Sequence, residues 1–529
     1  MKENTMLDLI IRNVKIYDGK ESAPYVADIG IRGERIREIG RLDETEGRDE
    51  IDGRGLCAMP GFIDTHCHSD MTLLYDRQHA NGLAQGITTE VLGQDGLSYA
   101  PLSPDNLKMY AKYLRGLNGW FEDVPLDFGS VSEYLSRFDK KAGPNVAYQV
   151  PHGTVRLEAM GFHDRPLSGY ALDKAKDLMR RAFEEGAVAF STGLSYYPCS
   201  YADTKEMIEL CRVCAEYDVP YVTHTRTVFR EEPFDATLEA IEIAKEAGCR
   251  LHFSHFRTGP DNCGRAEELM APIEKAIAEG MRITLETYPY YSGSGYAVIF
   301  LPPWAVEGGY EATLERLKNP ALREKICEGM RKNTIPTTGT FTHLRENEEY
   351  VGMDFAEVAR LRGTSNENMI CDILLEEELD VGYYSNPVED EEKRAQMDRD
   401  FVWLLTRPYY MVCTDSIPYG LKPHPRSFGT FPRFLRLSRE QGVSFGTMAN
   451  RMAANPAAVF GLKDRGVIEQ GYYADLVLLD EKKVTDTATY RDPRRAPEGI
   501  AHVIVNGRIA VYKEKVTGLF AGRAIKRGV

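Results

Sequence analysis

Two histidines separated by one residue follow a short apolar run early in the chain. The run from Gly61 to Thr65, within PGFIDTHCHSD, predicts a buried β-strand, and His66, Cys67 and His68 come directly after it. Alternate side chains of an extended chain point the same way, so the two histidines share one side and the cysteine faces the other. Two imidazoles on one face suit a divalent metal ion; the alternative is a pair of ordinary histidines near a strand end.

Further side chains of metal-ligand type are expected at the ends of other strands. In a barrel of parallel strands the active site lies at the C-terminal ends of the strands. Those ends carry histidines, aspartates and hydroxyl-bearing residues: His66, His68, His152, His224, His255, Asp95, Asp415, Ser191, Thr192 and Tyr288. A lone histidine on an apolar strand is usually a packed one, but so many at strand ends favour a metal centre.

The candidate metal ligands are enough for two ions: His66, His68, Asp95, His224, His255 and Asp415. Nitrogen and carboxylate ligands without cysteine favour zinc, although manganese, iron or cobalt would also be tolerated. Two close ions can hold a bridging water and lower its pKa, and one of them can polarise a carbonyl. Asp415, after the last strand, would accept the proton of that water and pass it to a leaving amine. This chemistry hydrolyses an amide, an ester or another C–N bond.

The elements that must position these residues alternate between strand-like and helical patterns. The strand-like runs are 61–65, 87–96, 145–153, 187–194, 219–225, 250–256, 283–290 and 409–416. Amphipathic helical patterns separate most of them, as at 172–186, 204–218, 237–248 and 266–280. This α/β alternation predicts parallel βα units, and eight strands is the number that closes a (β/α)8 TIM barrel.

The two ends of the chain carry a different pattern. Apolar and polar residues alternate, with Gly and Asp between the runs, at 7–57, 471–484 and 500–516. Such a pattern predicts strands, and the simplest arrangement pairs both ends into one small β-domain, a β-sandwich. We expect this domain to span 1–58 and 462–529, and the metal-dependent barrel to span 59–461.

One irregular stretch interrupts the barrel pattern between the seventh and eighth strands. From Gly293 to about Pro408 the chain carries extra helices and loops rich in Gly and Pro. Within it, residues 293–345 are predicted to form an insertion or lid. A long excursion at the C-terminal end of a barrel strand is often a lid or specificity element, and plain structural padding is the alternative.

The composition limits the classes of function. The chain has 529 residues and a net charge of −15 without a basic block, which argues against a nucleic-acid surface. Its first residues lack the apolar core of a signal peptide, and no stretch is apolar for long enough to cross a membrane. The ten cysteines are scattered, as in a reducing compartment, and Cys211 and Cys214 are predicted to pack within a helix. We therefore expect a cytoplasmic protein with a small-molecule substrate; a homo-oligomer stays open.

Several motifs resemble a known family. PGFIDTHCHSD, YVTHT, FSHF and CTDS resemble the metal-dependent amidohydrolase superfamily. STGLSYYP, ETYPYYSGSG, LPPWAVEGG and KPHPRSFGTFPR resemble its N-acyl-D-amino-acid deacylase (D-aminoacylase) branch. The resemblance covers nearly the whole chain. It implies an enzyme that uses one or two zinc ions to hydrolyse N-acyl-D-amino acids to a carboxylate and a free D-amino acid.

The resemblance also implies roles for individual metal ligands. His224 and His255 are similar to the ligands of a tighter metal site. His66, His68 and Asp415 would surround a second, weaker site, with Asp415 also acting as general base and general acid.

Other residues are similar to the substrate-binding residues of the branch. Arg426, in KPHPR, matches the arginine that holds the substrate carboxylate, and its bidentate fork suits that task. Tyr288 and Ser294 match its hydrogen-bonding helpers. Arg426 could instead pair with a carboxylate of the lid. His152, in the PHGTVR motif with Arg156, either lines the pocket or has a structural role.

Two positions depart from the branch pattern. Where the branch usually has Asn-Cys-Gly with a cysteine ligand, this chain has Gln94-Asp95-Gly96. We expect Asp95 to bridge two ions in place of the thiolate, with weaker selectivity for zinc; alternatively it turns away and only one ion binds firmly. Arg257 stands where the branch often has a lysine beside the substrate. It keeps the positive charge with a different reach, so the substrate preference stays open.

Other functions fit the sequence less well. A cyclic-amide hydrolase of the hydantoinase or dihydroorotase type usually bridges its metals with a carbamylated lysine, and no lysine lies at a predicted strand end here. A deaminase would leave the branch motifs and the carboxylate anchor unexplained. A non-catalytic barrel scaffold would normally lose metal ligands, whereas this chain lacks only the cysteine and retains Asp415.

Overall fold

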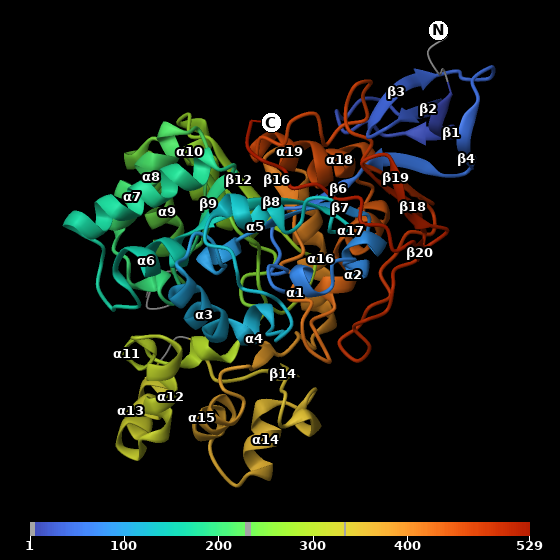
Figure 1. Ribbon diagram of the computed structural model, residues 1–529. Coiled ribbons are helices and arrows are strands. Elements are labelled where there is room, and N and C mark those ends of the chain that lie inside the picture. Colours follow the sequence, from blue (N-terminus) through green and yellow to red (C-terminus); the bar gives the residue numbers. More distant parts are fainter. Residues whose placement is uncertain (1–5, 228–233, 333–334, 529) are drawn as a thin grey trace.

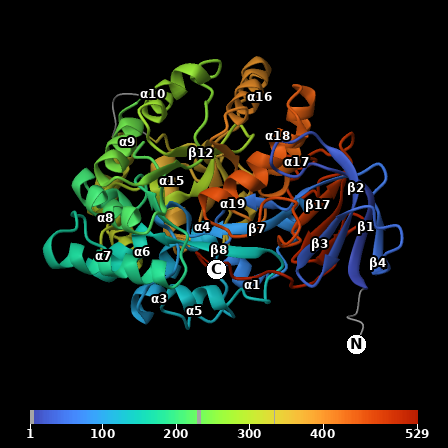
Figure 2. The ribbon, with the colours of Figure 1, turned by 90° about the horizontal axis from the view of Figure 1, so that it is seen from above.

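Eight parallel strands form the centre of the computed structural model, which describes residues 6–227, 234–332 and 335–528. The strands are β6 (Phe62–Asp64), β7 (Ile87–Leu92), β8 (Asn145–Pro151), β9 (Ala189–Gly193), β10 (Pro220–His224), β11 (Arg250–Phe253), β12 (Ile283–Thr287) and β16 (Tyr410–Val412). They are hydrogen-bonded in chain order, and helices surround them (Figures 1 and 2). The predicted (β/α)8 barrel is confirmed.

Amphipathic helices cover the outside of the barrel because one face of each is apolar. Helix α7 (Gly169–Glu184), for example, buries Ala175, Leu178, Met179, Ala182 and Phe183, which recur at helical spacing. The other outer helices include α5 (Val131–Ser136), α6 (His152–Met160), α8 (Thr204–Glu216), α9 (Asp235–Ala247), α10 (Ala266–Ala278), α16 (Glu391–Leu405) and α17 (Arg426–Glu440). Cys211 and Cys214 are buried in α8.

Short helices follow the first two barrel strands and the last one. They are α1 (Thr72–Tyr75), α2 (Ala80–Ala84), α3 (Pro104–Tyr113), α4 (Arg115–Asn118), α18 (Phe445–Ala449) and α19 (Asn455–Val459). Apolar side chains near α19 close one end of the barrel: Phe460 and Leu462 pack with the strand residues Ile63, Val91 and Val222. No helix in the described part of the chain has the length and apolar character to cross a membrane.

The first and last barrel strands are joined by the segments that follow them. The Asp415 amide donates to the His66 carbonyl at 2.8 Å, and the His68 amide donates to the Ser416 carbonyl at 2.7 Å. The buried Asp64 carboxylate at the end of β6 accepts hydrogen bonds from the backbone amide and the hydroxyl of Thr414. These contacts, rather than a regular strand ladder, close the barrel between β6 and β16.

Both chain ends contribute to one nine-stranded sheet beside the barrel. Its strands are β1 (Leu7–Ile16), β2 (Tyr25–Arg32), β3 (Arg35–Gly40), β4 (Gly47–Asp52), β5 (Cys57–Pro60), β17 (Leu476–Leu479), β18 (Ile500–Val505), β19 (Arg508–Tyr512) and β20 (Lys515–Val516). The antiparallel pairing of β5 with β17 joins the N-terminal and C-terminal parts of the sheet. Figure 1 shows these two parts, in blue and red, side by side. Most pairs are antiparallel, but β1 pairs in parallel with β4 and β5. Side chains from both ends share one apolar core, among them Ile11, Ile31, Leu476 and Ile504.

The insertion between β12 and β16 forms a lobe with its own small sheet, at the bottom of Figure 1. The sheet contains β13 (Ser294–Tyr296), β14 (Thr340–His343) and β15 (Gly382–Tyr384). Its helices are α11 (Pro303–Val306), α12 (Tyr310–Lys318), α13 (Pro320–Lys332), α14 (Phe355–Leu361) and α15 (Asn366–Glu376). The predicted segment 293–345 supplies β13 and β14, whereas β15 lies beyond it. The exact domain boundaries stay predictions.

We predict that Thr414→Val destabilises the protein by about 1–3 kcal/mol, because a buried carboxylate loses a hydroxyl donor that no water can replace. The difference in free energy of unfolding would be measured by chemical denaturation. Thr406→Val is a matched control, since the exposed Thr406 hydroxyl has local partners, the Trp403 carbonyl one turn away and the Arg407 guanidinium next to it. Equal stability of the Thr414 variant and the wild type would contradict this account of barrel closure.

Candidate functional site

Six side chains of metal-ligand type meet above the C-terminal ends of the barrel strands. In strand order they are His66 and His68 after β6, Asp95 after β7, His224 at the end of β10, His255 after β11 and Asp415 after β16. The structure therefore brings together every residue that the sequence suggested as a metal ligand. Their roles as ligands stay predictions.

Asp95 lies between two pairs of histidines. Its Oδ2 atom is 3.6 Å from Nε2 of His66 and 3.6 Å from Nε2 of His68. On the other side, Asp95 groups with His224 and His255, whose facing Nδ1 and Nε2 atoms lie 2.9 Å apart. A carboxylate in this position can serve ions on both sides, so the alternative in which Asp95 turns away does not match its orientation.

Asp415 connects the metal-ligand group to a buried arginine. Its Oδ1 atom is 3.7 Å from His66 Nε2 and 3.5 Å from His68 Nε2. Its Oδ2 atom accepts a hydrogen bond of 2.7 Å from the Arg426 guanidinium. Burial alone would raise the pKa of Asp415, but Arg426 and the neighbouring imidazoles hold it well below its usual value. The carboxylate is therefore ionised and able to accept a proton.

The donor set fits a divalent metal ion. His66 Nε2 and Asp95 Oδ1 are buried and have no hydrogen-bond partner among the described residues, which is costly unless something else satisfies them. Burial lowers the pKa of His255 to about 3, so its imidazole is neutral and keeps a free lone pair. Burial would raise the pKa of Asp95, yet His66 and the other imidazoles hold it at about 2. Neutral imidazoles and ionised carboxylates are the forms that bind zinc.

Three of the candidate ligands have a backbone conformation that few side chains adopt. The φ angles of Asp95, His255 and Asp415 are 55°, 35° and 51°. Non-glycine residues with positive φ are uncommon, and each such residue costs energy that the surrounding structure must offset. The left-handed turns direct these three side chains from the strand ends towards the centre.

A glycine on β9 leaves room for Asp95. A Cβ atom on Gly193 would lie 2.5 Å from the Asp95 carbonyl oxygen and 3.1 Å from the Asp95 Cβ atom. It would also approach the Tyr196 ring to 2.5 Å. The Tyr196 ring in turn contacts the His224 imidazole, with 4.6 Å between their centroids. Any larger residue at position 193 must therefore displace both an expected ligand and a ring beside another ligand.

The expected substrate-binding residues lie next to this centre. The Tyr288 ring contacts two guanidinium groups, that of Arg257 at 4.3 Å and that of Arg426 at 4.8 Å from its centroid. Arg257 also donates to the Tyr288 hydroxyl at 3.0 Å. Ser294 presents its carbonyl, not its hydroxyl, to Arg426 at 3.3 Å, while its hydroxyl donates to the Tyr383 carbonyl. Arg426 pairs with Asp415 and with no carboxylate of the lid among the residues that the structure describes.

His152 lies outside the group of expected ligands. It begins α6 and is fully buried, and its Nε2 atom lies 2.9 Å from the Glu206 carboxylate. The same carboxylate pairs with Arg156. This contact network matches the structural alternative for His152 better than a place in the substrate pocket.

Sequence reasoning missed several residues that hold the site together. His424 accepts a hydrogen bond from the Arg426 amide at its Nδ1 atom, so Nε2–H is left to donate to the Ser292 hydroxyl at 2.9 Å. Glu286 and His252 lie inside the barrel below the metal ligands. A signal for Glu286 was present, because a carboxylate interrupts the otherwise apolar strand ITLETYPY and needs a buried partner.

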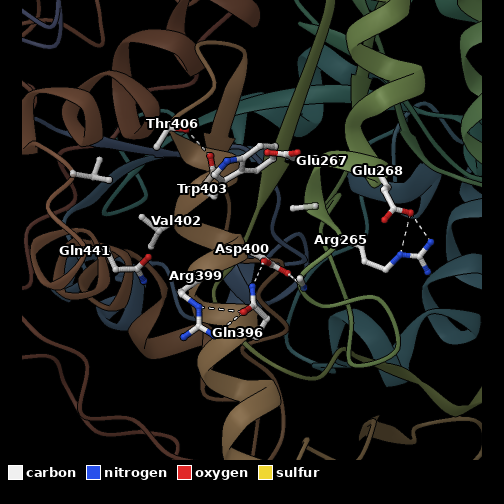
Figure 3. Close-up of a pocket in the computed structure, with 13 residues that line it drawn as sticks. Arg265, Glu267, Glu268, Gln396, Arg399, Asp400, Val402, Trp403, Thr406 and Gln441 are labelled. Atoms are coloured by element: carbon white, nitrogen blue, oxygen red, sulfur yellow. Dashed lines mark hydrogen bonds and ion pairs between the residues drawn. The ribbon is translucent and has the colours of Figure 1, made fainter.

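A separate cavity of about 520 Å³ lies on the outer surface of the barrel (Figure 3). It lies between α10 and α16, and its lining includes Arg265, Glu268, Arg399 and Trp403. Asp400 accepts hydrogen bonds there from Gln396 and from the Gly264 amide. None of the candidate metal ligands lines this cavity, so we place the functional site at the strand ends.

We predict that Gly193→Ala lowers the amount of bound metal at least threefold, because the added methyl group displaces Asp95. Metal content of the purified protein, measured by mass spectrometry of the elements, checks this. Gly259→Ala is the control, since a Cβ atom there meets only the tip of Asn262 at 3.9 Å. Full metal content in the Gly193 variant would argue that Asp95 is not a ligand.

Comparison with known proteins agrees with this geometry. The model of the amidohydrolase family matches residues 49–511. The D-aminoacylase of Alcaligenes xylosoxydans xylosoxydans is 31% identical over 98% of this chain and 98% of its own. Two solved structures, both 30% identical, cover nearly the whole chain. The N-acyl-D-glutamate deacylase from Bordetella bronchiseptica, complexed with zinc and a phosphonate inhibitor, has a TM-score of 0.81 and covers 99% of this chain and 100% of its own. D-aminoacylase with a binuclear metal centre has a TM-score of 0.79 and covers 98% of this chain and 100% of its own. The chain belongs to the amidohydrolase family, in its D-aminoacylase branch.

Proposed function

We propose that this protein hydrolyses the amide bond of N-acyl-D-amino acids to a carboxylate and a free D-amino acid in a metal-dependent reaction. The observation that carries the proposal is the position of Asp95 between two histidine pairs, beside the ion pair of Asp415 and Arg426. The small-molecule substrate, its linear amide bond and its D-configuration follow from the activities of the relatives.

Zinc is the metal we propose, as one ion or two. His224, His255 and Asp95 would hold one ion, and His66, His68, Asp95 and Asp415 would surround the other. Manganese or cobalt would also find suitable ligands in this set of nitrogen and oxygen atoms. When bound, such an ion activates a water molecule and polarises the amide carbonyl.

Asp415 is the proposed proton carrier of the reaction. It would accept the proton of the attacking water and then donate it to the nitrogen of the leaving amine. Arg426 holds one of its oxygens at 2.7 Å, which directs the other oxygen towards His66 and His68. The positively charged guanidinium also keeps the carboxylate ionised between turnovers.

The α-carboxylate of the substrate would bind between Arg257 and Arg426. Arg257 donates to the carbonyls of Tyr290 and Ser292 and to the Tyr288 hydroxyl, and it has no carboxylate partner in the described part of the chain. Its positive charge is therefore available to an anionic substrate. Tyr288 separates the two guanidinium groups and sets the spacing between them.

Alternative functions have less support. A bridging carbamylated lysine, typical of cyclic-amide hydrolases, has no candidate here because no lysine lies at the C-terminal end of a barrel strand in the described part of the chain. A non-catalytic scaffold would not need the buried, strained ligand set. We also propose that the protein is cytoplasmic, which is supported by its ten free cysteines.

The function is tested by measuring free-amine release from N-acetyl and N-formyl amino acids of both hands, with hydantoins alongside. The protein would first be stripped with a chelator and then loaded with Zn²⁺, Mn²⁺ or Co²⁺. We expect turnover of D-substrates only after loading, and none in the stripped protein. Opening of hydantoins without deacylation would move the protein to the cyclic-amide hydrolases.

We predict that Asp415→Asn lowers kcat at least about a hundredfold, because an amide cannot carry the proton to the leaving amine. The circular dichroism spectrum should stay that of the wild type, and metal should remain on His224, His255 and Asp95. Asp43→Asn, at an exposed position, serves as the control and should be fully active. Near-normal turnover in the Asp415 variant would overturn its role as proton carrier.

A further inference from the structure

A row of polar side chains lies inside the barrel beneath the expected metal ligands. Thr284 and Glu286 are two residues apart on β12, so they face the same way, and His252 on β11 is the register partner of Thr284. His252 and Glu286 are completely buried. A buried carboxylate is costly unless its oxygens are fully hydrogen-bonded, so its partners reveal what it does there.

Glu286 contacts an expected metal ligand directly. Its Oε1 atom lies 2.7 Å from Nδ1 of His66. A carboxylate only accepts hydrogen bonds, so the His66 Nδ1 atom carries the proton and donates it. The lone pair of the imidazole is then on Nε2, the atom that faces Asp95 and Asp415 and has no hydrogen-bond partner among the described residues.

Two other residues fix Glu286 itself. Its Oε2 atom accepts a hydrogen bond from the Thr65 hydroxyl and lies 3.1 Å from His252 Nε2. The other nitrogen of His252 lies 2.8 Å from the Thr284 hydroxyl. The carboxylate of Glu286, on β12, thus has partners in the segment that follows β6 and on β11. It cannot swing away from His66 without losing its contacts to Thr65 and His252.

The His66 ring lies next to two other expected ligands. Its centroid is 5.4 Å from that of His68 and 5.0 Å from that of His255. The Nδ1 atom of His68, in contrast, is buried without a partner in the described residues. The His-x-His pair is therefore held asymmetrically, with a carboxylate behind the first ring and packing behind the second.

We propose that Glu286, fixed by Thr65 and His252, is a positioning residue that sets the proton and the orientation of His66 for metal binding. This inference rests on the proposed function of the site, because it assumes that His66 is a ligand. Carboxylates that accept a hydrogen bond from a metal-bound histidine typically change metal affinity 10–100-fold when they are removed. Glu286 would do so from the interior of the barrel, without touching the substrate.

The test measures Zn²⁺ affinity, not only activity. Metal-free wild type and Glu286→Gln would compete for Zn²⁺ with a chromogenic chelator. We expect about 10–100-fold weaker binding in the variant. We also expect activity that returns as Zn²⁺ is raised, with KM for the substrate unchanged. A merely structural role would lower thermal stability without this recovery.

Asp380→Asn provides a matched control. Asp380 is also a buried carboxylate beside a histidine, with its Oδ1 atom 3.3 Å from His343 Nε2, but neither residue belongs to a group that could hold a metal ion in the described part of the chain. Its variant should bind Zn²⁺ as the wild type does. His252→Gln should also weaken Zn²⁺ binding, by a smaller factor than Glu286→Gln, about threefold or more. If Glu286→Gln does not fold, His252→Gln is the variant that tests the positioning role.

The outcomes separate the inference from the proposed function. Zn²⁺ affinity within twofold of the wild type in folded Glu286→Gln, or in His252→Gln where that variant decides, would overturn the positioning role. A wild type that binds Zn²⁺ but releases no amine from N-acyl-D-amino acids would overturn the proposed function, while the effect of Glu286→Gln on binding would still support the positioning role.

Discussion

The closure of the barrel between its first and last strands is the constraint on which the rest of the structure depends. Strands β6 and β16 form no regular ladder with each other. The join is made by the backbone of His66, His68, Asp415 and Ser416 together with Asp64 and Thr414. The peptides that close the barrel are thus the peptides that carry expected metal ligands. Fold and site therefore cannot vary independently here: a change that opens this join also separates Asp415 from the histidine pair.

Backbone strain also occurs at three of the expected ligands. Asp95, His255 and Asp415 adopt positive φ angles at three different strand ends, although each residue could be accommodated more cheaply in an extended turn. Gly193 gives the space that Asp95 requires, and the buried contacts of the barrel supply the energy that holds the turns. Other non-glycine residues with positive φ, such as His79 and Asp464, lie elsewhere in the chain. At the three strand ends, however, the strained turn directs an expected ligand towards the centre.

Much of the fold could be predicted because its signals are local. The eight strands and the His-x-His pair depend on short patterns of apolar and polar residues, and the motifs identified the family. The interior contacts could not be predicted in the same way. Glu286 and His66 are 220 positions apart, and His152 looked like the other strand-end histidines until its partner Glu206 was seen. The carbonyl of Ser294, not its hydroxyl, faces Arg426 because the pairing of β13 with β15 turns the side chain away, and that pairing joins residues far apart in the sequence.

The first of the two chain connections between the terminal domain and the barrel is a single residue. Strand β5 ends at Pro60 and β6 begins at Phe62, so Gly61 alone separates a strand paired with β17 from the strand that precedes His66. Gly61 also packs against Thr88, where a side chain would collide. The barrel and the terminal sheet therefore cannot easily be exchanged between relatives. Recombination at this junction would have to preserve the angle of β5, because that angle sets the direction in which β6 enters the barrel.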